Sequence, residues 1–533
     1  MTAVALTQRT ARLRPPRALR LEIKHSPVVW VLPVLAALFY FNAYRTAAGY
    51  PPTWTLRASV IAGPNLIFFT VVAAGIAAWA ATRETRRKTG DLLATTARGA
   101  WARRATVLAA TVFWMVLAYL AGVAVIYIQA ARQATWGGPP LWPVVAGVVG
   151  VAASCAVGFV CGTLLPGRFT APVVAVVVFA AWFVGVAAAN NVNNFQNVSD
   201  ATGSPALFVA TDGGRPQNVD VGVYYHVPPD VSIARVMFMG GVLLVVVGVL
   251  ALVPAARVPG VRAWSSAPGW GLTARRLAVV AAAIGVACGV AASATAFSLA
   301  GTARYSLTTD WEIPALHDAA DDQPVPYTPD CTGSTFTVCI HPAFDPYLGA
   351  MSAALRPAAA EIAGLPGAPA RAEMTPGFAP AAVAGTTSVY DYSTEYEDYG
   401  DASFWATPAM ARTVDWEQGM QQGFITWFVS GPADQDAPGP TPAQEAAAIA
   451  LLAKIGAPVP AEYPEFSPSG PQSGGSSMST ASGGSGTRPT ASAAQITAAA
   501  HGLESLSSAA RHSWLAANIA ALRSGAITLA QVP

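Results

Sequence analysis

The sequence predicts a mainly α-helical, polytopic membrane protein of about seven spans, followed by a mixed α+β domain outside the membrane. The first observation is the composition: 53% of the 533 residues are hydrophobic and only 11% are charged, whereas about 25% of the residues of a soluble protein are charged. The second is that the apolar excess lies within the first 300 residues. The third is that seven segments in this part are long enough to cross a hydrocarbon core of about 30 Å, which takes about 20 helical residues.

The seven predicted spans follow one another between residues 28 and 300. Helical periodicity does not define them, because a lipid-exposed helix is apolar nearly all round. The long basic stretch before the first span argues against a cleavable signal peptide. The spans lie near residues 28–45, 58–81, 106–130, 142–165, 171–189, 234–256 and 278–300.

The distribution of basic residues predicts the orientation of the spans. With a cytoplasmic N-terminus, the inner segments carry 18 Lys and Arg residues and the three outer loops carry four. Positive charge is enriched on the cytoplasmic side of membrane proteins. We therefore expect a multi-pass protein of the cell membrane with its N-terminus in the cytoplasm. After seven crossings, the C-terminal segment from residue 301 onward would be extracytoplasmic.

The segment 301–533 has the composition of a soluble folded domain. It carries 22 acidic and eight basic residues, which is typical of a solvated surface, and its length is sufficient to bury a core. A flexible Gly/Ser-rich stretch is expected at 467–490, and Thr441 is expected to cap a helix. Helices of this domain are expected over 347–364, 441–456, 492–509 and 511–524, with Trp514 and Leu522 packed inward.

Cys331 and Cys339 are the only two cysteines outside the predicted spans. The residues between them place a turn-forming Thr-Gly-Ser between short β-prone runs. An extracytoplasmic location permits oxidation, so we expect a disulfide that closes a small hairpin. A metal pair is the weaker interpretation, because no further Cys or His pair at zinc spacing accompanies these cysteines.

The outer segment contains titratable residues but no recognisable catalytic motif. Neither an HExxH zinc motif nor a G-x-S-x-G nucleophile elbow occurs, so we expect no enzyme activity. A histidine beside a proline, such as His341, is more often structural than catalytic. The acidic and aromatic cluster over 390–399 could bind cations or a basic peptide, although a solvated loop is the commoner outcome. The candidate residues are His317, His341, Asp345, His501, Glu504 and His512.

The membrane half lacks the groups that usually drive transport by ion coupling. No Asp or Glu lies inside any predicted span, and Arg235 lies at the rim of the sixth. Secondary transporters usually place ionisable groups within the bundle, so transport would need another energy source. No GxxxxGK[ST] phosphate-binding loop occurs in the chain. We therefore expect no cofactor in this chain, and any ATP would bind to a separate subunit.

The loop after the second predicted span carries the most informative motif. Residues 81–93 read Ala-Thr-Arg-Glu-Thr-Arg-Arg-Lys-Thr-Gly-Asp-Leu-Leu. This loop resembles that of the type-2 permease family of ATP-binding-cassette transporters, in which a Glu and Arg pair, a Thr-Gly step and a Leu-Leu helix follow the second span. The residues that match are Arg83, Glu84, Arg86, Thr89, Gly90, Leu92 and Leu93.

The resemblance implies that this loop couples the chain to an ATPase. In the family, the loop forms a short helix that docks into a groove on the nucleotide-binding subunit. Leu92 and Leu93 would supply an apolar knob, and the neighbouring basic residues would meet acidic rims or lipid phosphates. A basic cluster beside a membrane helix is more often only a topology determinant, and it is the Thr-Gly-Asp-Leu-Leu sequence that favours the coupling interpretation.

A second similarity to the family lies before the first span. The stretch from Arg17 to Lys24, Arg-Ala-Leu-Arg-Leu-Glu-Ile-Lys, is similar to the amphipathic helix with which the family begins along the inner membrane surface. Such a helix needs a well-separated apolar face. Here it is short, and Pro15 and Pro16 precede it.

The sequence divides into four parts, and the resemblance, which covers the first six spans (roughly residues 8–256), implies a transport function; the seventh span and the outer domain depart from the family pattern. The parts are a cytoplasmic segment with an interfacial helix (1–27), a six-span permease-like domain (28–256), a loop with a seventh span (257–300) and the added outer domain (301–533). The chain would be a permease subunit, most readily an exporter. Its partners would be a cytoplasmic ATP-binding subunit, a second permease as homodimer or pair, and the lipid bilayer, with no nucleic acid. The alternative is a non-transporting membrane anchor whose outer domain binds a ligand or an envelope partner.

Overall fold

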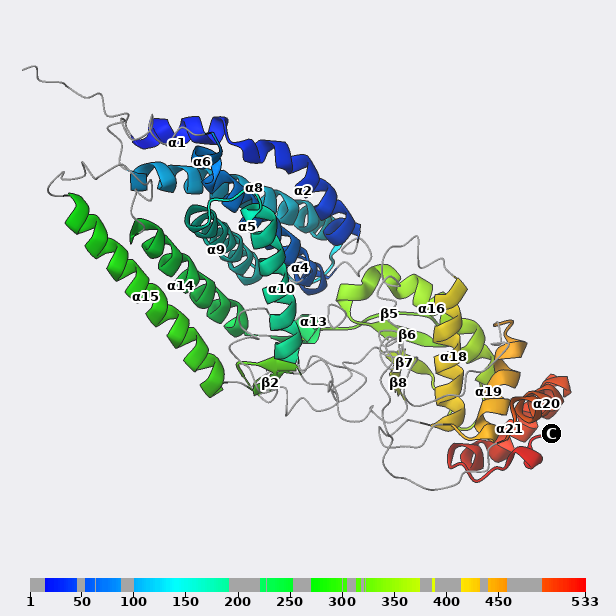
Figure 1. Ribbon diagram of the computed structural model, residues 1–533. Coiled ribbons are helices and arrows are strands. Elements are labelled where there is room, and N and C mark those ends of the chain that lie inside the picture. Colours follow the sequence, from blue (N-terminus) through cyan, green and yellow to red (C-terminus); the bar gives the residue numbers. More distant parts are fainter. Residues whose placement is uncertain are drawn as a thin grey trace, which may run out of the picture. The chain divides into compact units, whose positions relative to one another are not determined.

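The described residues of the computed structural model form two compact units, which divide after Val325. The first unit is built mainly from helices, and the second combines a small sheet with helices (Figure 1). Each unit is considered by itself below. The structure describes residues 15–45, 53–62, 64–87, 100–190, 221–226, 228–252, 270–299, 301–303, 313–317, 321, 323–373, 386–388, 414–431, 440–457 and 491–533.

Each of the seven predicted spans coincides with helical structure in the first unit. The helices are α1 (Pro15–Lys24), η1 (Pro27–Val31), α2 (Leu32–Phe39), η2 (Tyr40–Tyr44), α4 (Trp54–Ala62), α5 (Pro64–Ala81), α6 (Arg83–Arg86), α8 (Ala100–Gln133), α9 (Trp142–Leu164), α10 (Thr170–Asn190), α13 (Val221–Tyr224), α14 (Asp230–Leu252) and α15 (Trp270–Leu299).

Five helical stretches among the described residues are long and apolar enough to cross a membrane. The second and fifth predicted spans correspond to shorter apolar helices, Phe68–Ala81 and Thr170–Gly185. A polytopic membrane protein fits this arrangement, whereas the number of seven crossings and their orientation remain predictions. The five long stretches are Arg17–Tyr44, Trp101–Gln133, Trp142–Leu164, Asp230–Ala251 and Arg276–Ala296.

Small residues bring the helices of the first unit close together. A Cβ atom placed on Gly158 of α9 would overlap the carbonyl oxygen of Ala74 in α5, and one on Gly162 would overlap that of Ala78. Close backbone approach through small residues is the usual way in which membrane helices associate, because lipid supplies no hydrophobic drive between them. Two tightly packed helices, α5 and α9, therefore form the centre of the unit.

Helices α14 and α15 form a second close pair and lie side by side in Figure 1. Gly241 of α14 faces Gly285 of α15, and a Cβ atom on either glycine would lie against the other's carbonyl oxygen. Gly248 faces Ala278 in the same way. Because the numbering rises on one helix as it falls on the other, the two helices run antiparallel.

After α15 the chain returns to the beginning of α14. Strand β2 (Gly301–Ala303) pairs with β3 (Ile313–Ala315), and β1 (Tyr225–His226) pairs with β4 (Gln323–Pro324). The carboxylate of Asp230 accepts hydrogen bonds from the backbone N–H of Val231 at 2.6 Å and of Leu316 at 3.1 Å, and lies 2.8 Å from Nδ1 of His317. Asp230 therefore holds the returning segment at the first turn of α14.

The second unit is built on a four-stranded sheet in the order β5-β6-β7-β8. Strand β5 (Asp330–Thr332) is antiparallel to β6 (Thr337–Ile340), while β6, β7 (Arg371–Glu373) and β8 (Thr386–Ser388) are parallel. A parallel pair needs a crossover connection, which the 18-residue helix α16 (Asp345–Ile362) supplies between β6 and β7.

Four further helices complete the described part of the second unit: α18 (Val414–Ser430), α19 (Pro442–Lys454), α20 (Ala493–Ser505) and α21 (Ser508–Arg523), followed by the turn η6 (Leu529–Gln531). The predicted helices 347–364, 441–456, 492–509 and 511–524 coincide with α16, α19, α20 and α21 within a few residues. The core contains Met351 and Leu355 of α16 together with Phe424 and Phe428 of α18, all fully buried.

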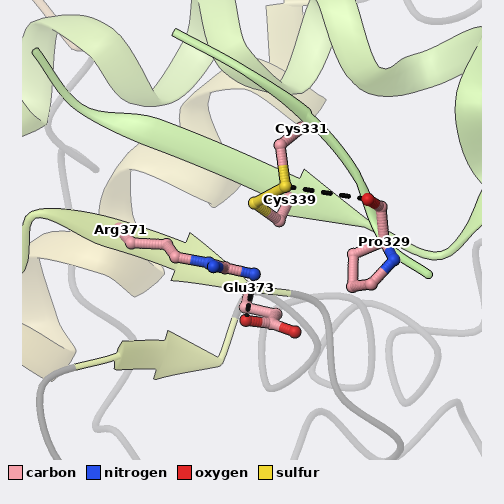
Figure 2. Close-up of a disulfide and its surroundings, with 5 residues drawn as sticks. All are labelled: Pro329, Cys331, Cys339, Arg371 and Glu373. Atoms are coloured by element: carbon pink, nitrogen blue, oxygen red, sulfur yellow. Dashed lines mark hydrogen bonds and ion pairs between the residues drawn. A yellow bond between two sulfur atoms is a disulfide. The ribbon is translucent and has the colours of Figure 1, made fainter. Parts of the chain in front are cut away.

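The predicted disulfide between Cys331 and Cys339 is confirmed, with an S–S distance of 2.05 Å. The two cysteines lie directly opposite each other in the antiparallel β5–β6 pair, as Figure 2 shows. The Sγ atom of Cys331 is 3.8 Å from the carbonyl oxygen of Pro329. On the neighbouring strand β7, Arg371 and Glu373 form an ion pair of 2.6 Å. The disulfide therefore closes the hairpin at the edge of the sheet.

Candidate functional site

The described part of the loop that follows the second predicted span lies directly after α5. Helix α5 ends at Ala81, and the buried Thr82 donates its hydroxyl to the carbonyl oxygen of Trp79 at 3.0 Å. Helix α6 then begins at Arg83 and ends at Arg86. The loop therefore starts with one helical turn held against the end of the apolar helix α5.

An ion pair joins this turn to the N-terminal helix. Arg83 Nη1 of α6 donates to Glu22 Oε2 of α1 at 3.3 Å, and both side chains are 32% exposed. Glu22 belongs to the N-terminal segment that resembles the family's amphipathic helix, and Arg83 opens the loop that resembles its coupling loop. The structure thus brings together two segments separated by 61 residues.

A second ion pair joins the turn to the start of α8. Glu84 Oε1 lies 3.7 Å from Nε of Arg103, and Glu84 also interacts electrostatically with Arg104. Consecutive residues of α6 therefore bind to two different helices. Partly exposed ion pairs contribute only about 0.2–1 kcal/mol each, so their main effect is to orient α6 between α1 and α8.

Helix α1 is itself held against α8. The indole N–H of Trp114 in α8 donates to the carbonyl oxygen of Ile23 at 2.9 Å, and Ala18 is buried in the packed face of α1. Arg20 and Leu21 are exposed on α1. The predicted N-terminal helix is thus confirmed as a helix, whereas its position along the membrane surface remains a prediction.

The last residues of the turn are cationic and exposed. Arg86 Nη2 donates to the carbonyl oxygen of Trp79 at 2.7 Å, and its guanidinium lies 4.4 Å above the Trp79 ring. Arg87 is exposed. We refer to α1, α6 and residues 100–104 of α8 as the Arg/Glu corner. It carries seven Lys and Arg residues and two Glu residues, so it suits contact with an acidic protein surface or with lipid phosphates.

The remaining residues of the predicted coupling motif, Thr89, Gly90, Leu92 and Leu93, lie outside the described residues. The structure therefore places Arg83, Glu84 and Arg86 of the motif and says nothing of its apolar half.

Four of the candidate titratable residues of the outer segment have local partners. His317 binds Asp230 within the first unit, and within the second unit His501 Nδ1 is 3.2 Å from Glu504 and His512 Nε2 is 3.0 Å from the carbonyl oxygen of Ala363. Within the described part of the chain, no group of three or more His, Cys, Asp and Glu residues could hold a metal ion. The acidic and aromatic cluster over 390–399 lies outside the described residues.

His341 is a structural residue of the second unit. It is fully buried, and its Nδ1 accepts a hydrogen bond from the backbone N–H of Ala343 at 3.0 Å, which caps the turn η5 (Pro342–Phe344) before α16. Its ring packs against Tyr327 with centroids 4.1 Å apart. The interpretation of His341 as structural rather than catalytic fits this geometry.

We expect acid to destabilise the second unit through His341. Burial lowers the pKa of His341 to about 4, compared with about 6.5 in an unfolded chain. Between these values the unfolded chain binds a proton that the folded chain does not, so stability is fully present above pH 6.5 and falls as the pH decreases toward 4. The difference corresponds to about 3 kcal/mol. Hydrogen exchange of β6 and α16 amides, corrected for intrinsic rates, measures this loss.

His341→Asn is the matched control for this measurement, because an Asn side chain can still cap the turn but does not titrate. The stability of the variant's second unit should change much less with pH between pH 6.5 and pH 4 than that of the wild type. An equal loss of stability in the variant and the wild type would assign the effect to other groups.

Two arginines of the first unit have a placement that the sequence did not predict. Arg57, counted with an outer loop, lies within α4 and is 2% exposed. Arg235 is the sixth residue of α14, close to the expected rim along the helix, yet its side chain is only 4% exposed. The one feature of the sequence that could have indicated this burial is that each arginine lies at the beginning of an apolar run. Only the tertiary structure shows that both side chains point inward.

No family model, curated protein or solved structure matches this chain. The resemblance to type-2 permeases therefore rests on the residues of the loop and of the N-terminal helix.

Proposed function

We propose that the chain is the transmembrane permease subunit of an ATP-binding-cassette transporter, which exports a molecule with energy from a separate ATPase subunit. The observation that supports this function is the 3.3 Å ion pair between Glu22 and Arg83. It connects the two segments that separately resemble the permease family. Coupling to an ATPase needs such a connection, because a force applied to the loop must reach the membrane helices.

The contacts of α6 supply a route for that force. A partner that moves the loop would displace Arg83 and Glu84 together, and these residues bind α1 and α8. Helix α8 has 34 residues and is about 50 Å long at 1.5 Å per residue. Motion at the Arg/Glu corner would therefore reach the other end of the bundle. The tight contact of α5 with α9 would make those two helices move as one body.

In this proposal the Arg/Glu corner faces the cytoplasm and the second unit is extracytoplasmic. The excess of basic residues in the predicted inner segments and the disulfide between Cys331 and Cys339 both support this orientation. Two permease chains would bind two ATPase subunits within the bilayer. The second unit would recognise the substrate or a partner in the cell envelope.

We expect a cytoplasmic ATPase subunit to copurify with the detergent-solubilised wild-type protein and to be lost from the double variant Leu92→Glu, Leu93→Glu. Two carboxylates in the apolar knob would have to be buried at the interface, which should weaken the complex at least tenfold. Capture from native membranes, followed by identification of the bound proteins, measures this result.

Leu141→Glu is the matched control, because Leu141 is 66% exposed just before α9, in a predicted outer loop. It should retain the ATPase subunit. If the wild type captures no ATPase subunit, the membrane-anchor alternative is favoured. The charge-swapped double variant Glu22→Arg, Arg83→Glu should bind the subunit better than either single variant if the ion pair positions the loop.

A further inference from the structure

The exposed face of helix α1 is cationic. Arg17, Arg20 and Lys24 are exposed at positions i, i+3 and i+7, which lie on one face of a helix and extend over about 10 Å. Glu22 is the only carboxylate of α1, and it lies on the other side of the helix, where it pairs with Arg83. The outward face of α1 therefore has a local excess of positive charge.

The opposite face of α1 packs against the other helices. Ala18 is buried, and the carbonyl oxygen of Ile23 accepts a hydrogen bond from the indole N–H of Trp114 in α8 at 2.9 Å. Figure 1 shows α1 at the periphery of the first unit, beside α8. A helix on a membrane surface usually inserts its apolar face among the lipids. Because α8 covers that face here, α1 presents its charged face to the surroundings instead.

The exposed residues change from cationic to apolar after α1, in the order expected at a membrane boundary. Trp30 of η1 is 85% exposed, and Val34 of α2 and Phe41 of η2 are exposed as well. The stretch Arg17–Tyr44 is long and apolar enough to cross a membrane. Tryptophan is enriched at the interface between headgroups and hydrocarbon, and basic residues flank membrane helices on the cytoplasmic side. When α2 spans a bilayer, the cationic face of α1 therefore lies at the level of the headgroups.

We propose that the cationic face of α1 binds the phosphate groups of anionic phospholipids. Guanidinium and ammonium groups donate charge-assisted hydrogen bonds to phosphate oxygens, and each basic residue near an anionic lipid surface strengthens binding about fivefold. The exposed apolar residues that follow in α2 favour a lipid over a protein as the occupant, because a phospholipid carries acyl chains beside its phosphate. The inference requires that α2 crosses a bilayer, but it does not require coupling to an ATPase.

The test uses the purified full chain in nanodiscs of phosphatidylcholine that contain a small fraction of a photoactivatable lipid. This lipid is either phosphatidylglycerol or phosphatidylcholine, with the same diazirine-bearing acyl chain in both. After illumination, mass spectrometry measures the labelled fraction of the peptide that contains Trp30. Each variant is first checked for the wild-type helical circular dichroism.

We expect phosphatidylglycerol to label the wild type at least fivefold more than phosphatidylcholine does. The double variant Arg20→Gln, Lys24→Gln should lower this ratio at least threefold, since it removes two of the three charges and leaves the packed face unchanged. Arg356→Gln, Lys454→Gln is the matched control, because it removes one exposed arginine and one exposed lysine from the second unit, and it should keep the wild-type ratio. The charge-preserving variant Arg20→Lys, Lys24→Arg should keep it as well.

Three outcomes would overturn the proposal. The first is equal labelling of the wild type by the two lipids, or an unchanged ratio in the double variant Arg20→Gln, Lys24→Gln. The second is loss of the labelling in an excess of inorganic phosphate, which would mean that the face binds free phosphate rather than lipid. The third is that this double variant keeps the lipid ratio but releases the ATPase subunit, which would assign the face to a protein interface.

The lipid site and the permease function can fail separately. If labelling by phosphatidylglycerol depends on Arg20 and Lys24 but no ATPase subunit is captured, the lipid site stands and the proposed energy source is wrong. If the ATPase subunit is captured but neither lipid is preferred, the permease function stands and the lipid site is rejected.

Discussion

Gly158→Leu is expected to prevent α5 and α9 from packing and to leave little folded protein in the membrane. A Cβ atom at this position would overlap the backbone carbonyl oxygen of Ala74, which cannot move unless the whole helix moves. Separation of the helices would also remove the contact of Gly162 with Ala78. Because α9 packs against α4, α5, α8, α10 and α14, we expect a loss of more than about 4 kcal/mol, at the upper end of single substitutions.

The yield of monodisperse protein after mild solubilisation and the midpoint of thermal unfolding measure this effect. Gly289→Leu on α15 is the matched control, since a Cβ atom at Gly289 would meet no atom within 4 Å. The control should be obtained in wild-type yield. Similar yields of the two variants would show that α5 and α9 are not closely packed in the membrane.

Hydropathy alone predicted where the apolar helices of the first unit lie but not how they pack. Each predicted span coincides with helix because a long apolar run has few alternatives to helix in lipid. The positions of Gly158 and Gly241 against their partner helices could not be predicted, since these helices are apolar all round and carry no amphipathic stripe. The spacing of Gly158 and Gly162 by four residues is a local signal of a helix contact, and Gly285 and Gly289 have the same spacing.

The residues of the Arg/Glu corner were predictable, but their pairing was not. The motif identified Arg83 and Glu84, and a separate similarity identified the segment that contains Glu22. Nothing in the sequence indicates that Glu22 meets Arg83, because the two residues are far apart in the chain. The same reason applies to the hydrogen bond that Arg57 donates to Gln133, which lies 76 residues away in the chain.

In the second unit, local signals predicted α16, α19, α20, α21 and the β5–β6 hairpin, but not α18, β7 or β8. Thr441 accepts from the backbone N–H of Gln444 at 3.3 Å, and Gln444 Oε1 accepts from that of Thr441 at 2.6 Å, so the predicted cap is confirmed as a capping box. The strands have only three or four residues, too few for an alternating pattern to appear. Leu522 is fully buried as expected, whereas Trp514 is only half-buried.

Arg511→Ala is expected to destabilise the second unit by about 3–5 kcal/mol, the range for breaking a buried ion pair from one side. The Arg511 side chain of α21 is 5% exposed. Its Nε and Nη2 donate to Glu361 Oε1 of α16 at 3.1 and 2.6 Å, and its Nη1 donates to the carbonyl oxygen of Leu506 at 3.3 Å. One guanidinium therefore joins α21, α16 and the connection after α20.

The loss is best measured by hydrogen exchange of α16 and α21 amides in the full chain. Arg356→Ala is the matched control, because Arg356 is an exposed arginine of α16, and it should change stability by less than about 0.5 kcal/mol. Glu361→Gln in the Arg511→Ala background should recover part of the loss, since it removes the charge that the substitution leaves unpaired. If Arg511→Ala were as stable as Arg356→Ala, the ion pair would not hold α21 on α16, and the apolar contacts of Leu515, Ile519 and Leu522 would have to account for that packing alone.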